Sequence, residues 1–160
     1  MSKFTHIDEK GQVRMVDVTA KKPTERTAKA QGCISMTPET FSAIMDQSVK
    51  KGNVLETARI AGIMAAKKTA SLIPMCHPLN ITHVQIDFVP DPANNIIRIE
   101  AVVRIIDQTG VEMEALTAVS IAALTIYDMC KSHDKTMTIS DVMLLKKSGG
   151  KSGTFTRDLN

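Results

Sequence analysis

The chain has 160 residues and a formal net charge of +3, a length typical of one domain built on a single core. No run approaches the ~18 apolar residues of a membrane span, and the first residues carry charges without an apolar signal segment, so we expect a cytoplasmic protein that contacts no membrane. The cysteines form no CxxC pair and aromatic residues are few, which excludes a disulfide framework, a zinc site of the usual spacing and a base-stacking surface for nucleic acid.

The N-terminal part of the chain is mostly polar. Residues 1–27 are rich in threonine and lysine, which predicts a poorly anchored arm. A weak strand is predicted at Gln31–Met36. Thr37 and Pro38 then have the pattern of a helix N-cap and a first-turn proline, which predicts a short helix that ends at about Gln47.

The middle of the chain predicts a long helix, a stiff turn and a hairpin. Val54–Ile73 has a helical pattern, and Gly62 within it indicates close approach by another element. Pro74–Pro78 has a proline at each end, which makes it a stiff turn. Apolar and polar residues alternate over 84–88 and 97–105 with turn residues between them, which predicts two hairpin strands.

Thr109–Lys131 is the longest periodic stretch. Thr109 followed three residues later by Glu112 is a capping-box pattern, which predicts the start of a helix. One arc of this helix is apolar and is predicted to be core: Val111, Ala115, Leu116, Ala118, Val119, Ala122, Ala123, Ile126 and Met129. Glu114 and Asp128 lie on the other arc, roughly 21 Å apart at about 1.5 Å per residue. If both carboxylates serve one site, a second chain would supply one of them.

The C-terminal part predicts one more strand and a basic loop. Met137–Leu145 alternates with one slip near Asp141, as a β-bulge produces. The segment KKSGGKSG at 146–153 superficially resembles a phosphate loop, but Leu145 stands where that motif needs glycine and no helix follows. We therefore reject that motif. We expect only that the glycines let backbone amides approach a phosphate and that the neighbouring lysines contact its oxygens. The tail is predicted to contain no further helix or strand.

The predicted order of elements is β, α, α, β, β, α, β. This order is that of the ferredoxin-like split βαβ fold, an α+β fold with a four-stranded antiparallel sheet and helices on one face. We expect a flexible arm at 1–27, a ferredoxin-like domain at 28–147 and a flexible basic, glycine-rich tail at 148–160. The uncovered sheet face should carry about half of the apolar strand residues, which favours association.

Several side chains are candidates for chemistry. Asp128 and Lys131 stand three apart on one helical face, where each favours the charged form of the other and can exchange protons with a ligand. A surface ion pair is the alternative, and Lys51 is equally compatible with a solvated loop lysine. His77, held between prolines, fits either a structural or a catalytic histidine. Together with the many lysines, these residues suggest a small phosphorylated ligand.

Four stretches of the chain resemble one family. They are KGNVLETARIAGIMAAKKTASLIPMCHPL, TGVEMEALTAVSIAALTIYDMCK, LLKKSGGKSG and, near the start, MVDV. They resemble the cyclic pyranopterin monophosphate synthase (MoaC) family of molybdenum cofactor biosynthesis. The resemblance implies a lyase that converts 3′,8-cyclo-7,8-dihydroguanosine triphosphate to cyclic pyranopterin monophosphate and pyrophosphate. It also implies a ferredoxin-like subunit in a homohexamer, a trimer of dimers with its sites at the dimer interface.

The resemblance also implies roles for individual residues. Lys51, Asp128 and Lys131 would be the acid–base group, with a lysine tuned by the neighbouring carboxylate to transfer protons near neutral pH. The substrate pocket would be lined by Met75, Cys76, His77, Glu112, Met113 and Glu114, and the phosphates would be held by Arg26, Lys67 and Lys147. No ligand spacing demands a metal, so we expect no cofactor apart from any magnesium that accompanies the triphosphate.

Two other functions compete with catalysis. The main alternative is a non-catalytic module that binds a small phosphorylated ligand, because ferredoxin-like domains also bind effectors at interfaces. Such a binder would lose affinity gradually in Lys51→Ala or Asp128→Ala, whereas a catalyst would lose turnover and keep binding. An RNA-binding sheet would need aromatic residues on the hairpin strands, and Ile97–Ile106 has none.

Overall fold

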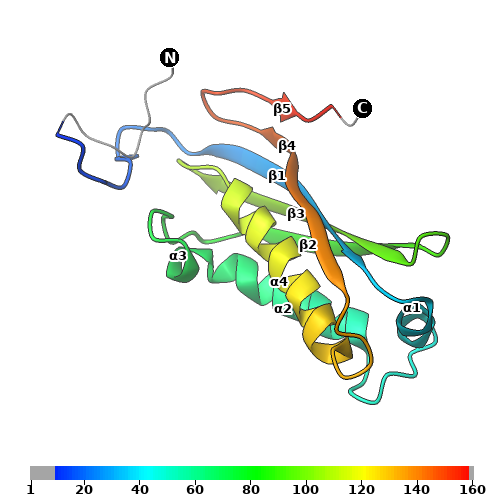
Figure 1. Cartoon of the computed structure of the whole chain (residues 1–160). Coiled ribbons are helices and arrows are strands. Elements are labelled where there is room, and N and C mark those ends of the chain that lie inside the picture. Colours follow the sequence, from blue (N-terminus) through cyan, green and yellow to red (C-terminus); the bar gives the residue numbers. More distant parts are fainter. Residues whose placement is uncertain (1–9, 159–160) are drawn as a thin grey trace.

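One antiparallel sheet organises residues 10–158, the part of the chain that the computed structural model describes (Figure 1). Its strands lie in the order β2-β3-β1-β4-β5. The strands are β1 (Thr24–Ser35), β2 (His83–Asp91), β3 (Ile96–Asp107), β4 (Thr138–Ser148) and β5 (Phe155–Thr156). The helices are α1 (Pro38–Met45), α2 (Val54–Lys67), α3 (Thr69–Leu72) and α4 (Glu112–Cys130). The first four strands and two long helices confirm the ferredoxin-like arrangement, to which β5 adds a short fifth strand.

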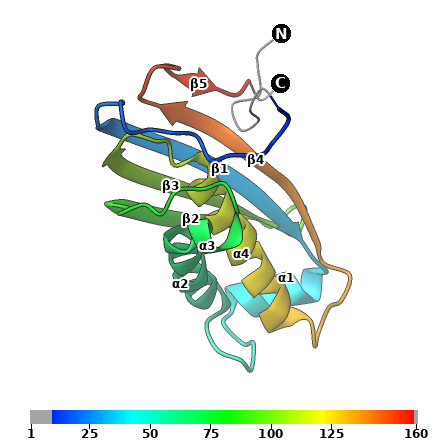
Figure 2. The same cartoon turned by 90° about the vertical axis from the view of Figure 1, so that its left-hand side faces the viewer.

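The long helices α2 and α4 cover one face of the sheet, and α1 lies at one end of it (Figures 1 and 2). The predicted core arc of α4 is buried, except that Leu116 is half-buried. Gly62 lies where α2 meets α4: an added Cβ would overlap the Ile86 side chain and would lie 2.9 Å from the Ala118 carbonyl oxygen. The predicted close approach at Gly62 is confirmed. The predicted Val54–Ile73 helix, however, is interrupted at Lys68, between α2 and α3.

The length and composition of α4 would also suit a membrane-spanning helix, with a mean hydropathy of 1.3. In the fold, 56% of this stretch is buried inside the protein. The reason is that its apolar residues pack against the sheet and α2. Burial of that kind is typical of a core helix.

The start of α4 differs from the predicted capping box. The N-cap is Val111, and no side chain caps the helix. Glu112 is the first helical residue, so it cannot be the third-position partner that a Thr109 cap requires. Its side chain instead folds back over Gly110, where an added Cβ would overlap the Glu112 carboxylate. The capping box is therefore wrong, although the helix itself is confirmed.

The first strand is longer than the sequence predicted. β1 begins at Thr24, which pairs with Asp107, rather than at Gln31. Residues 24–27 were predicted to belong to the polar arm because all four are polar and show no alternation of apolar and polar residues. Residues 1–9 of the predicted arm lie outside the described residues.

The uncovered sheet face carries fewer of the apolar strand residues than the predicted half, but it is not wholly polar. Alternation along β1 and β3 places on it the polar residues Thr27, Lys29, Gln31, Arg98, Glu100 and Arg104, together with Cys33, Ile96, Val102 and Ile106. Lys29 and Arg98 both reach the Glu100 carboxylate, at 2.7 Å and 3.3 Å. Most apolar residues of β1 and β3 face the helices, while Ile106 on the uncovered face is 67% exposed. Association through this face stays a prediction.

The C-terminal part adds a strand that the sequence did not predict. Asp141 has a positive φ of 53°, and the pairing of β1 with β4 shifts between Gln31 and Cys33, so the predicted bulge is confirmed. After the glycine-rich turn, β5 pairs with the end of β4. The Arg157 amide then donates to the Leu145 carbonyl at 2.8 Å.

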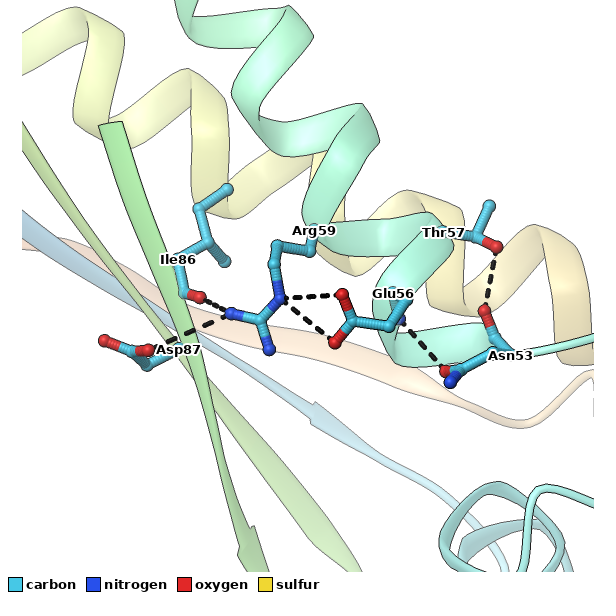
Figure 3. Close-up of polar contacts among 6 residues, drawn as sticks. All are labelled: Asn53, Glu56, Thr57, Arg59, Ile86 and Asp87. Carbon is cyan, nitrogen blue, oxygen red and sulfur yellow. Dashed lines mark hydrogen bonds and ion pairs between the residues drawn. The ribbon is translucent and has the colours of Figure 1, made fainter. Parts of the chain in front are cut away.

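Arg59 ties α2 to the edge strand β2. Its guanidinium donates to the Ile86 carbonyl and faces Asp87, while the Glu56 carboxylate accepts from Nε at 3.1 Å (Figure 3). The guanidinium carbon also lies 5.1 Å from the centroid of the Phe88 ring, a cation–π distance. These contacts fasten the helical layer to the edge of the sheet.

Candidate active site

Three charged side chains meet at the C-terminal end of α4: Asp128 from the helix, Lys131 directly after it and Lys51 from the loop between α1 and α2. We call them the lysine–aspartate cluster. Lys131 Nζ lies 2.7 Å from Asp128 Oδ1. Lys51 Nζ donates to the Asp128 carbonyl at 2.9 Å and lies 3.9 Å from Asp128 Oδ2. Lys51 and Asp128, which lie 77 positions apart in sequence, are therefore in direct contact. The side chains of Lys51, Asp128 and Lys131 are all exposed, so a ligand can reach them.

Electrostatics favours the charged forms of Asp128 and Lys131. The hydrogen bond and the charge of Lys131, helped by Lys51, lower the pKa of Asp128 below its ordinary value. In return, Asp128 raises the pKa of Lys131. Each group therefore favours the charged form of the other, as the sequence predicted for this pair. Lys131 has an ammonium group that can donate a proton, and Asp128 has an ionised carboxylate that can accept one.

The loop between α1 and α2 places Lys51. Gly52 has a φ of +105°, a conformation that glycine adopts freely. Asn53 then caps α2 by accepting from the Glu56 amide at 3.1 Å. A sharp turn followed at once by a capped helix leaves Lys51 at the tip of the loop, from which its side chain reaches α4.

A second group lines a cavity of about 290 Å³ near the N-terminal end of α4, which we call the glutamate cavity. All six predicted pocket residues line it: Met75, Cys76, His77, Glu112, Met113 and Glu114. The N-terminal arm closes one side with Val16, Val18 and Lys21. His77 Nε2 lies 3.0 Å from the Val16 carbonyl oxygen, and because a carbonyl only accepts, Nε2 carries the proton in that contact.

Glu114 is the buried acid of the glutamate cavity. It is 4% exposed, and burial, with the nearby charge of Glu112, raises its pKa from 4.5 to about 7. Burial and the charge of Glu114 also raise the pKa of the Cys76 thiol. Glu114 can therefore hold or release a proton near neutral pH, while Cys76 stays a thiol.

A third cavity, of about 630 Å³, adjoins the β4–β5 turn, and we call it the arginine cavity. Arg26 donates to the carbonyls of Asp107 and Gln108, both at 2.9 Å. An added Cβ at Gly150 would overlap the Arg26 guanidinium, so glycine makes room for it. Lys21, Lys22, Lys151 and Ser152 also line this cavity. Such a concentration of cations suits an anionic ligand.

Comparison with known proteins shows the family of the chain. The model of the MoaC family matches residues 15–150. The chain belongs to the MoaC family. Similar proteins named cyclic pyranopterin monophosphate synthase include one from Desulforapulum autotrophicum, 65% identical, covering 99% of this chain and 97% of the relative. Another, from Desulfatibacillum aliphaticivorans, is 63% identical and covers 99% of each chain. A third, from Chloroflexus aurantiacus, is 59% identical over 98% of this chain and 96% of the relative.

The structure of this MoaC chain gathers most of the predicted site residues and separates others. Lys147 approaches the arginine cavity by donating to Ser152, which lines it. Lys67, the last residue of α2, lines neither the glutamate cavity nor the arginine cavity. Lys21, which was not among the predicted site residues, lines both cavities. The signal that could have indicated it is the basic pair that it forms with Lys22.

The two ends of α4 are too far apart to act on one small group within one chain. Fourteen residues separate Glu114 from Asp128, which is roughly 21 Å along a helix. Within residues 10–158, no three His, Cys, Asp or Glu side chains gather as ligands for a metal ion. The expectations about cofactors and about a second chain stay predictions.

Proposed function

We propose that this chain is a cyclic pyranopterin monophosphate synthase, a lyase of molybdenum cofactor biosynthesis. The observation that carries the proposal is the 65% identity, over nearly the whole of both chains, to a protein of that name. The three sites described above supply the side chains that such chemistry needs. We infer as its substrate 3′,8-cyclo-7,8-dihydroguanosine triphosphate, and as its products the cyclic monophosphate and pyrophosphate.

In this proposal, the lysine–aspartate cluster moves protons. Opening a purine imidazole ring requires protonation of a departing nitrogen, for which the Lys131 ammonium is placed and charged. Closing a cyclic phosphate requires removal of a proton from a ribose hydroxyl, and Asp128 is the ionised acceptor in reach of both lysines. General acid–base groups of this kind contribute about 10²–10⁴-fold to a rate.

The cavities would bind the two halves of the substrate. The arginine cavity, with Arg26 and three lysines at its wall, would hold the triphosphate and stabilise negative charge as pyrophosphate leaves. Lys147 would assist there. The glutamate cavity, with a carboxyl group that titrates near neutrality, would hold the purine-derived ring through hydrogen bonds from Glu114 and His77. Lys67 would reach phosphate only across an interface between chains.

The separation along α4 supports a site shared by two chains. We propose a homohexamer of three dimers, in the cytoplasm, in which the lysine–aspartate cluster of one chain faces the glutamate cavity of its partner. An arrangement of this kind would bring acid–base groups and binding groups together without bending α4. No cofactor is proposed beyond magnesium carried by the triphosphate.

A turnover assay tests the proposed activity against the binding-module alternative. The purified chain is mixed with the cyclised GTP derivative, and released pyrophosphate and the pterin product are measured. The parent should turn over, and Asp128→Ala should lose about 100-fold or more of kcat while its dissociation constant, measured by calorimetry, changes little. Asp87→Ala, at an exposed aspartate on the edge strand β2, is the matched control and should behave like the parent.

The opposite results are equally clear. A parent protein that binds the substrate but releases no pyrophosphate would support the non-catalytic module. Equal turnover by Asp128→Ala and by the parent would remove the lysine–aspartate cluster from the mechanism.

A further inference from the structure

Asp134 is a buried carboxylate just beyond the C-terminal end of α4, and the proposed function does not use it. It is 4% exposed. Its Oδ2 accepts from the Thr37 amide at 2.9 Å. Its Oδ1 accepts from the Thr136 amide at 2.8 Å and from the Thr136 hydroxyl at 2.6 Å. One side chain therefore joins two segments that lie 97 residues apart in sequence.

Each of these segments leads directly to a member of the lysine–aspartate cluster. Thr37 is the N-cap of α1, and α1 leads into the loop that carries Lys51. Asp134 itself stands three residues after Lys131, in the turn that leaves α4. Both views of the fold show α1 and the end of α4 at the same end of the molecule (Figures 1 and 2).

The backbone hydrogen bonds of the Lys51 loop are mostly local, to the end of α1 and within the loop, such as that from the Gly52 amide to the Val49 carbonyl at 3.0 Å. Between α1 and α2, residues 46–53 are exposed except for Val49, which is buried. Val49 lines a recess together with Thr37 and Cys130. Of these residues, Thr37 donates its amide hydrogen bond to Asp134. Burial is the main cause that raises the pKa of the Cys130 thiol, with smaller effects from the charges of Lys51, which lowers it, and Asp134, which raises it. Asp134, α1 and Lys51 thus belong to one packed unit at the end of α4.

We propose that Asp134 is a positioning residue for the reaction: by clamping the start of α1 to the turn after α4, it fixes Lys51 against Asp128. The inference rests on the proposed function, because it assigns Asp134 a role through the lysine–aspartate cluster. Asp134 itself contacts backbone amides and a threonine hydroxyl, and it touches no reacting atom. A shift of about 1 Å in a catalytic group can cost about 100-fold in rate, so such a clamp matters for turnover.

Three variants separate positioning from ordinary stabilisation. Asp134→Ala removes the clamp. Thr136→Val is the matched control, because it removes one hydrogen bond to the same carboxylate and leaves the link to the Thr37 amide. Asp134→Asn keeps the side-chain shape and one accepting oxygen, and it serves if Asp134→Ala does not fold. Each protein is assayed for kcat and KM with the cyclised GTP derivative, and for amide hydrogen exchange in residues 46–53.

The clamp predicts a specific pattern. Asp134→Ala should lower kcat by about 10- to 100-fold with KM within about threefold, and Asp134→Asn should lower it less. Exchange in residues 46–53 should become faster in Asp134→Ala and stay at the parental rate in Thr136→Val. Thr136→Val should keep kcat within about twofold of the parent, because the link between the two segments is intact.

Failure of the clamp and failure of the proposed function give different results. If exchange in residues 46–53 is unchanged in both Asp134 variants, or if Thr136→Val lowers kcat as much as Asp134→Ala, the clamp is wrong. If the parent has no turnover, or if Lys51→Ala keeps full turnover, the proposed function or its catalytic assignment is wrong. In that case faster exchange in Asp134→Ala would still show that Asp134 holds the loop, but the positioning role in catalysis would be overturned.

Discussion

The buried carboxyl group of Glu114 makes the stability of the protein depend on pH in a direction opposite to that of most carboxylates. An ordinary salt-bridged acid stabilises the fold when it is ionised. Glu114 is 4% exposed in the glutamate cavity, and burial disfavours its ionised form. Glu114→Gln replaces it with a neutral side chain of nearly the same shape, so the comparison isolates the charge.

The magnitude follows from the pKa. Burial raises the pKa of Glu114 from 4.5 to about 7, so between these values the folded protein binds more protons at this site than the unfolded chain does. Stability therefore falls as the pH rises through that window and is fully present below it. At about 1.4 kcal/mol for each pKa unit, the loss is about 3 kcal/mol. Glu114→Gln should not show this loss.

Urea unfolding of the two proteins at about pH 4 and about pH 8 measures the effect. Other groups titrate alike in both proteins, so the free energy of unfolding of Glu114→Gln relative to the parent should rise by about 3 kcal/mol between these pH values. Glu112→Gln removes the neighbouring charge and should reduce the effect only partly, because burial is the larger cause. A difference that is the same at both pH values would refute the reasoning.

Three further substitutions test the packing around the sites. Gly62→Ala should lower the free energy of unfolding by about 1–3 kcal/mol, because its Cβ overlaps a neighbouring side chain; a stabilised variant would contradict this. Gly150→Ala should weaken pyrophosphate binding in calorimetry, whereas Gly153→Ala, also at positive φ but in open space, should not; equal effects would exclude a role for the Arg26 contact. Arg59→Ala should cost about 1–2 kcal/mol in urea unfolding through its lost hydrogen bond and ring contact, and a parental midpoint would show that these contacts contribute nothing.

The periodic parts of the fold could be predicted from the sequence. α4 follows from apolar residues repeated at the helical period, and the β2–β3 hairpin follows from alternation of apolar and polar residues. The bulge at Asp141 follows from one slip in the alternation along β4. β1 was predicted too short because one of its faces is polar and uncovered. The two-residue strand β5 lies beyond prediction, since its pairing depends on where β4 ends.

The candidate site could be predicted only in part. Residues close in sequence, such as the pocket segment 75–77, were found together as the prolines suggested. The three-residue spacing of Asp128 and Lys131 predicted that each favours the charged form of the other, and the structure confirms it at a distance of 2.7 Å. The contact of Lys51 with Asp128 could not be predicted in this way, because it joins residues 77 positions apart. Lys21 and Asp134 were not selected, because their roles depend on contacts with distant segments.

Subunit complementation tests most directly whether the two ends of α4 serve one reaction across an interface. Asp128→Ala and His77→Ala are each expected to be inactive, and they are unfolded and refolded together in equal amounts. If each site combines two chains, random pairing gives mixed dimers with one intact site, and about a quarter of the parental turnover should return. Turnover no greater than the sum of the separate variants would contradict a shared site.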